Sequence, residues 1–241
     1  MSITGAPGGP PVRVGTSLGD IAAALFTVIG IEAALLHRSR TGHGQIVDVA
    51  MLDCQIAILE NAILRLQTAG QSPGPLGTRH PSITPFQAYA CQDRPIVIAA
   101  GNDQLFAGCC AALGLDALVA DPRFSSNAGR TANADALQAA FEARLALAPA
   151  AHWLEALGAA GIPAGPINNV AEALAQPQVA ARNMLVATAA PDGTALKVAG
   201  NPVKLSAHPD PSTRPAAPAL DADRAAILAE LAAPPARAPA A

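Results

Sequence analysis

Long apolar runs separated by short glycine- and proline-rich breaks predict where the helices of this chain lie. Residues 17–38 are apolar over most of the surface that a helix would present, which is typical of a deeply buried helix. The segment 41–44 (Thr-Gly-His-Gly) ends it, because glycine readily adopts the left-handed conformation of a helix C-cap. A second helix is expected over about 49–68, and the breaker-rich segment 70–75 follows it.

Beyond residue 83 the pattern changes to shorter elements. Residues 86–91 and 96–100 predict two strands that form a hairpin, and 161–167 predicts a stiff crossing segment. Further helices are expected at 103–113, 132–147, 150–160, 170–175, 178–182 and 221–232, and further strands at 185–189 and 196–198, on either side of an Asp-Gly turn. The chain therefore predicts an α+β (α/β) fold, with a disordered proline- and alanine-rich tail.

Composition narrows the class of protein. The net charge is −3 without a basic stripe, which argues against nucleic-acid binding. The four cysteines form no C-x-x-C pair, so we expect buried free thiols in a reducing cytoplasm and no metal site. The longest apolar stretch, 21–36, contains Glu32 and is short for a membrane span, and no signal peptide is visible. We therefore expect a soluble cytoplasmic protein that binds no membrane.

Asp20 is the first candidate for chemistry, and its residue type allows two interpretations. With Ser17 it fits a capping box, in which the hydroxyl and the carboxylate accept hydrogen bonds from each other's backbone amides. The helix dipole also favours an anion at this place. The other interpretation is a nucleophile held on the first turn of a helix.

Several segments, in order along the chain, carry a family resemblance. They are 15–20, 40–49, 77–88, 100–106, 121–124 with Asn127 and Arg130, and 161–169. In this order they resemble the core of the family III CoA-transferases, also known as the carnitine dehydratase and bile-acid-inducible protein F (CaiB/BaiF) family, with its formyl-CoA transferase-like members. The resemblance extends from residue 1 to about residue 206.

The resemblance implies a reaction and a nucleophile. Asp20 occupies the position of the family's aspartate, which attacks an acyl-CoA thioester and passes through a mixed anhydride to an aspartyl-CoA thioester. An acceptor carboxylate then takes the CoA. The resemblance favours donors such as succinyl-CoA, with CoA as a substrate and no separate cofactor. Racemase relatives use an aspartate at this position as an acid/base, so that a racemase is the alternative reaction.

Other site residues follow from the same resemblance. Gly77 and His80 lie in a loop that, in the family, closes over the active site, where backbone amides would stabilise an oxyanion. A tight turn before a strand is the alternative for this loop. Arg38, Arg40 and Arg79 are the candidates for binding CoA phosphates, and Arg79 faces either solvent or a substrate carboxylate.

The sequence also departs from the family. Its first residues resemble an internal stretch, and the family's N-terminal portion, which supplies most of the CoA-binding half, has no counterpart here. We therefore expect weak CoA binding by the chain alone, and a truncated non-catalytic remnant or an interaction subunit is a further alternative. The resemblance implies an interlocked homodimer, with a separate N-terminal half as a second candidate partner. It places linker and long helices at 1–75, a small α/β domain at 76–182 and a return segment at 183–241.

Overall fold

The computed structural model describes residues 1–232 of the chain. Contacts divide it into two compact units, Met1–Ile167 and a second that begins at Asn168, and each is described by itself. Helices combine with two small sheets, which confirms the predicted α+β class. The domain boundaries at 75/76 and 182/183 stay a prediction, and the tail for which we predicted disorder lies outside the described residues.

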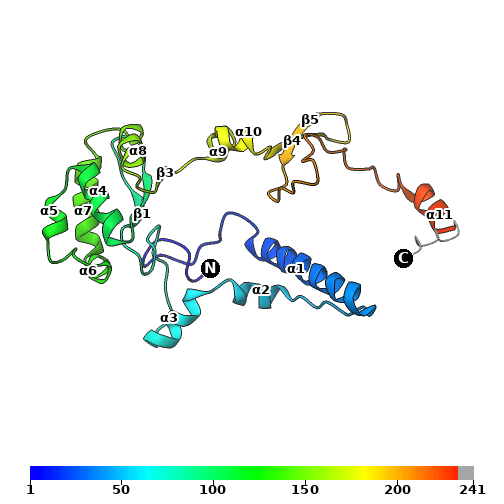
Figure 1. The fold of residues 1–241 in the computed structure, drawn as a ribbon, viewed down its shortest axis with the longest axis horizontal. Coiled ribbons are helices and arrows are strands. Elements are labelled where there is room, and N and C mark those ends of the chain that lie inside the picture. The colour runs from blue at the N-terminus through cyan, green and yellow to red at the C-terminus, as the bar shows by residue number, and fades with distance from the viewer. Residues whose placement is uncertain (233–241) are drawn as a thin grey trace. The chain divides into compact units, whose positions relative to one another are not determined.

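The order of elements is shown in Figure 1. The first unit contains α1 (Leu18–Thr41), α2 (Met51–Ala57), α3 (Asn61–Ala69), β1 (Phe86–Tyr89), β2 (Ile96–Ala99), α4 (Asp103–Leu113), α5 (Ala117–Ala120), α6 (Asn127–Ala132), α7 (Ala134–Leu145), α8 (Ala150–Ala159) and β3 (Ala164–Pro166). The second contains α9 (Val170–Leu174), α10 (Pro177–Ala181), β4 (Leu185–Ala189), β5 (Ala195–Ala199) and α11 (Arg224–Ala232).

Helix α1 lies where the apolar run predicted it. Gly42 ends it with a φ of 76°, and its N–H donates to the carbonyl oxygen of Arg38 at 2.8 Å. The expected C-cap is thus confirmed. His43 belongs to the same turn, since its Nδ1 lies 2.9 Å from the carbonyl oxygen of Thr41.

The surroundings of α1 differ from expectation. Ala22 is its one buried residue in the described chain, so the prediction of a deeply buried helix is wrong for residues 1–232. The reason is that α2 is the main element packed against it, and α2 covers only one side (Figure 1). By length and composition alone α1 would suffice to cross a membrane, contrary to what we expected from 21–36, although core helices of soluble proteins meet the same criterion.

The single helix predicted over 49–68 is wrong, because the chain breaks between α2 and α3. The N–H of Ile58 donates to the carbonyl oxygen of Cys54 at 3.2 Å and closes α2. Glu60 then turns the chain with a φ of 36° and a ψ of −108°. Residues other than glycine rarely adopt positive φ. Neither glycine nor proline marks this turn, so the sequence pattern does not reveal it.

The core of the first unit lies where β1, β2 and β3 meet α4, α7 and α8. The hairpin is confirmed: Phe86 pairs with Ala99 and Tyr89 with Ile96, in antiparallel register. Strand β3 adds to β2 inside the segment expected to be a crossing, a strand that the short Ala-Gly-Pro sequence does not predict. The largest fully buried apolar side chains of this core are Tyr89, Phe124, Phe141, Ile96, Ile98, Leu113, Leu137, Leu145 and Leu157.

The second unit begins with a capped helix. Asn169 Oδ1 accepts from the N–H of Glu172 at 2.9 Å, and Glu172 Oε2 accepts from the N–H of Asn169 at 2.9 Å. This capping box explains the conspicuous Asn169 as a residue that satisfies backbone groups. The hairpin of β4 and β5 is also confirmed, with Leu185 opposite Ala199.

Candidate active site

Asp20 is exposed on the first turn of α1. Ser17 occupies the N-cap position but makes no side-chain capping bond, so the capping box does not form. The hydroxyl of Ser17 instead accepts a long 3.5 Å hydrogen bond from Arg13 Nη2. Within residues 1–232 the carboxylate of Asp20 has no hydrogen-bond or ion-pair partner. The hydrogen bonds that the capping-box interpretation requires are therefore not formed, and the carboxylate of Asp20 is accessible to a substrate.

A side-chain amide lies beside the residue that precedes Asp20. A Cβ added to Gly19 would lie 3.3 Å from Cδ and 3.4 Å from Nε2 of Gln55. Helix α2 therefore brings Gln55 against the first turn of α1 because residue 19 has no side chain. The sequence pattern gives Gln55 no role, and no motif signals that it lies against the residue before Asp20.

The segment 77–80 is held on more than one side. Gly77 has a φ of 64°, and its N–H donates to the carbonyl oxygen of Gly5 at 2.9 Å. The N–H of His80 donates to the carbonyl oxygen of Phe86 at 2.9 Å. These two amides are already engaged within the protein, and the oxyanion role of the loop amides stays a prediction.

The ring of His80 is fixed in position and in tautomer. Its Nδ1 accepts from the N–H of Ser82 at 3.2 Å and of Ile83 at 3.0 Å, and the ring stacks on Phe86 with centroids 5.3 Å apart. A nitrogen that accepts two N–H groups carries no proton, so the neutral ring is protonated at Nε2. His80 therefore presents a single hydrogen-bond donor to its surroundings.

The guanidinium of Arg79 ties the loop to α7. Nε donates to Gln87 Oε1 at 2.8 Å, and Nη2 donates to Asp135 Oδ1 at 2.8 Å and to Gln138 Oε1 at 2.9 Å. The contact with Arg79 also satisfies the side-chain oxygen of the buried Gln87. The role of Arg79 in CoA binding stays a prediction, for which Nη1 remains open in the described chain while Nε and Nη2 hold these partners.

Three of the predicted site residues meet in one cavity of about 260 Å³. Gly77, Arg79 and His80 line one side of it, and Glu60 and Arg65 line it from the α2–α3 turn and α3. Sequence reasoning gave neither of the latter two a role, because the turn at residue 60 is invisible in the helical pattern.

The remaining predicted residues lie elsewhere. Asp20, Arg38 and Arg40 are not among the residues that line this cavity. Arg38 borders a second hollow of about 210 Å³ with Leu35 and Val47. At 1.5 Å per residue, Asp20 and Arg38 are separated by about 27 Å along α1. Only an extended molecule would contact both.

A buried arginine positions the chain that follows the loop. Arg130 is fully buried, and its Nε donates to the carbonyl oxygen of Thr84 at 2.8 Å. Its Nη2 contacts Asp103 Oδ1 at 2.8 Å. Asn127 Oδ1 accepts from the N–H of Thr84 at 3.0 Å. Asn127 and Arg130 carried the resemblance without an assigned role, and the structure shows them holding the segment after His80.

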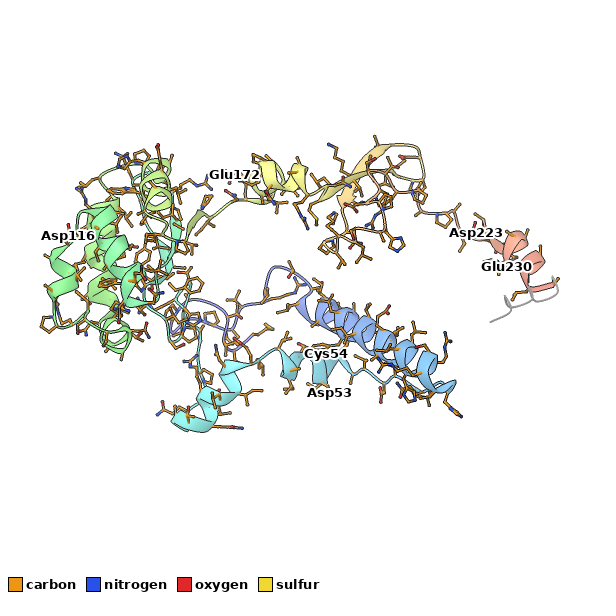
Figure 2. The ribbon with its side chains drawn as sticks, in the orientation of Figure 1. Asp53, Cys54, Asp116, Glu172, Asp223 and Glu230 are labelled. Carbon is orange, nitrogen blue, oxygen red and sulfur yellow. The ribbon has the colours of Figure 1, made fainter. Side chains whose placement is uncertain are left out.

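The four cysteines are free thiols; Cys54, Cys109 and Cys110 are buried as predicted, whereas the prediction of burial is wrong for Cys91, which is only half-buried. Figure 2 shows Cys54 on the side of α2 nearer α1. Burial raises the pKa of the Cys109 and Cys110 thiols to about 12. Burial also raises the pKa of the half-buried Cys91 thiol to about 11. These three thiols are therefore weak nucleophiles at neutral pH.

The model of CoA-transferase family III matches residues 1–224, and the chain belongs to this family, as the resemblance predicted. It is 47% identical over 238 residues to the acetyl-CoA:oxalate CoA-transferase of Acetobacter aceti, covering 98% of this chain and 60% of that protein. It is 36% identical over 231 residues to the succinate–glutarate CoA-transferase of Agrobacterium fabrum, covering 96% of this chain and 58% of that protein.

A solved structure shows the same fold. The crystal structure of a CaiB/BaiF family protein from Brucella suis matches with a TM-score of 0.75 and 38% sequence identity. The match covers 96% of this chain and 60% of that one. The chain thus spans 58–60% of the length of these two relatives and of that solved structure.

Proposed function

We propose that this chain carries the nucleophile of a CoA-transferase that moves CoA from an acyl-CoA to a carboxylic acid. A carboxylate oxygen of Asp20 attacks the thioester carbonyl, the C–S bond breaks and CoA leaves as a thiolate. The thiolate then attacks the aspartyl carbonyl of the mixed anhydride, which releases the donor acid and leaves an aspartyl-CoA thioester. The acceptor carboxylate runs the same steps in reverse and regenerates Asp20.

The observation that carries the proposal is the accessible, unpartnered carboxylate of Asp20 on the first turn of α1. A residue that served only as a cap would bond to the backbone of that turn. Membership of CoA-transferase family III supports the same reaction. The names of the relatives point to small dicarboxylic acids such as oxalate, succinate and glutarate as substrates, with succinyl-CoA as one donor.

The exposed surface of α1 supports a homodimer as the working form. Leu25, Val28 and Ile29 are each more than half exposed in the described chain, and together they form part of an apolar surface that water disfavours. A second copy of the chain is the partner we propose for it. Sedimentation equilibrium of the chain should give twice its mass of 24.1 kDa, and a stable monomer would contradict this assignment.

Trapping the intermediate tests the reaction. Wild-type chain is incubated with succinyl-CoA and an acceptor acid, hydroxylamine is added, and peptides are analysed by mass spectrometry. We expect a hydroxamate at Asp20, none in Asp20→Asn, and wild-type yield in Asp53→Asn. Asp53 is a matched control, because it is also an exposed acid on the first turn of a helix.

Three outcomes would overturn the assignment. Turnover of CoA by wild-type chain without any Asp20 hydroxamate would exclude the nucleophile. Exchange of a substrate α-proton with solvent, without CoA transfer, would indicate the racemase reaction instead. The Asp20→Asn variant should unfold within about 1 kcal/mol of wild type, since only a helix-dipole contact is lost. A larger loss would show that Asp20 is structural.

A further inference from the structure

We infer that the cavity formed by the α2–α3 turn, α3 and the segment 74–81 binds one carboxylate group of a small organic acid, through Arg65 and His80. This inference rests on the proposed function, because it assigns a place to the acid substrate. The cavity of about 260 Å³ has room for a dicarboxylic acid of a few carbon atoms.

Arg65 is the cation available to such a ligand. It is half-buried on α3 and lines the cavity, and in the described part of the chain its guanidinium has neither a hydrogen bond nor an ion pair. A guanidinium offers five N–H donors in a fork that matches a carboxylate. Arg79 lines the same cavity, but its Nε and Nη2 already donate to Gln87, Asp135 and Gln138, which, within residues 1–232, leaves Nη1 as its one nitrogen open to a ligand.

His80 supplies a second, pre-positioned donor. Ser82 and Ile83 hold Nδ1 as an acceptor, so Nε2–H is the only ring group left to meet a ligand. Stacking on Phe86 fixes the plane of the ring, with an angle of 3° between the two planes. A donor that is already oriented loses little entropy when a ligand arrives, which favours binding.

The charges of the lining favour a carboxylate over a phosphate. Glu60, Arg65 and Arg79 are its charged lining residues, and Arg79 is already paired with Asp135. A single carboxylate matches the charge of the one lining guanidinium that has no ion pair within residues 1–232, that of Arg65, whereas a phosphate dianion exceeds it. The carboxylate of Glu60 is engaged by Asn61, whose Nδ2 donates to Glu60 Oε1 at 3.1 Å.

Calorimetric titration of the full chain with succinate, glutarate and oxalate tests the site, with inorganic phosphate as the competing anion. We expect Arg65→Met and His80→Asn each to raise the Kd of the best-bound acid by about tenfold or more. The side-chain amide introduced by His80→Asn keeps an oxygen acceptor for the amides of Ser82 and Ile83 but lacks the distal donor. Arg182→Met should leave the Kd unchanged, because Arg182 does not line the cavity.

Nitrogen-15 NMR of the imidazoles tests the tautomer independently of folding changes in the variants. The His80 signals, identified by their loss in His80→Asn, should show an unprotonated Nδ1 and a protonated Nε2. Addition of the acid should shift Nε2. A proton on Nδ1, phosphate binding as tight as that of the acids, or a Kd unchanged in both variants would each overturn the site.

Neither measurement requires turnover, so the two proposals fail separately. An Asp20 hydroxamate together with an unchanged Kd in both variants would reject the cavity and keep the transferase. Acid binding that depends on Arg65 and His80, without any hydroxamate, would keep the cavity and reject the transferase.

Discussion

The side-chain amide of Gln55 lies against Gly19, one residue before the candidate nucleophile Asp20. The contact exists because glycine at position 19 lets α2 approach the first turn of α1. It places a neutral donor and acceptor against the residue next to Asp20, whose carboxylate has no partner in residues 1–232. Gln55 is therefore a candidate for positioning Asp20 or an acyl group attached to it.

Replacing Gln55 by Ala should slow CoA transfer about 2- to 10-fold, the range that corresponds to one neutral hydrogen bond. The free energy of unfolding should change by less than about 0.5 kcal/mol, because the residue is exposed. The rate of Asp20 hydroxamate formation and a urea titration measure the two effects. Gln71→Ala, an exposed glutamine in a loop, is the control. Equal rates in the two variants would remove Gln55 from the site.

Replacing Arg130 by Met should lower the free energy of unfolding by about 2–4 kcal/mol. The variant leaves the carbonyl oxygens of Thr84 and Phe124 without their donor in a buried place. Asp103→Asn should cost less than about 1 kcal/mol, because Asp103 is 74% exposed and its ion pair is largely solvated. Urea unfolding of both variants checks this. Equal losses would show that the ion pair, and not the carbonyl contacts, stabilises this region.

The sequence predicts the local elements of this fold better than their surroundings. Apolar periodicity and glycine placement located α1, α4 and the two hairpins, because those signals act within a few residues. The turn at Glu60 was missed, since no glycine marks its positive φ. The uncovered state of α1 was missed as well, because an apolar pattern shows that a helix needs a partner without showing which segment supplies it.

The residues of the candidate site also fall into two groups, those that the sequence identifies and those that only the structure reveals. Asp20, Gly77 and His80 belong to motifs that a resemblance can identify. Gln55 and Arg65 lie in ordinary helical sequence, and only the packing of α2 on α1 and the turn before α3 bring them to the site. The tautomer of His80 depends on backbone amides two and three residues later, which no residue type encodes.

Cys91 should be alkylated slowly in the folded chain. Burial, followed by the carboxylates of Asp93 and Glu142, raises its pKa from 9.0 to about 11. At pH 8 its reaction with iodoacetamide should be about a hundredfold slower than that of a free thiol, and it should rise about tenfold per pH unit up to about pH 11. Peptide mass spectrometry follows the reaction, with the urea-unfolded chain as the control. A free-thiol rate in the folded chain would contradict this environment.

In the second unit, lowering the pH should weaken the hydrogen bonds of the Asp210 carboxylate only below pH 3.8, the ordinary pKa of an aspartic acid side chain. A hydrogen bond from Lys204 lowers the pKa of this carboxyl, and a further one from Asn183 at 3.1 Å adds to the effect against the opposing desolvation. A lowered pKa means that the carboxylate stabilises the folded state above pH 3.8, and that this stabilisation is lost as the pH falls through the lowered value.

Carbon-13 NMR of the Asp210 carboxyl should therefore give a midpoint below 3.8 in wild type, and a higher midpoint in Lys204→Met, which lacks the ammonium donor. Asp210→Asn should remove the acid dependence of amide exchange near Asn183, because an amide side chain does not titrate in this range. Lys197→Met is the matched control: Lys197 lies on β5 and is not among the groups that lower the pKa of Asp210, so its loss should leave the midpoint in place. A wild-type midpoint at the ordinary value of 3.8 would mean that, in solution, Lys204 and Asn183 do not donate hydrogen bonds to the Asp210 carboxylate.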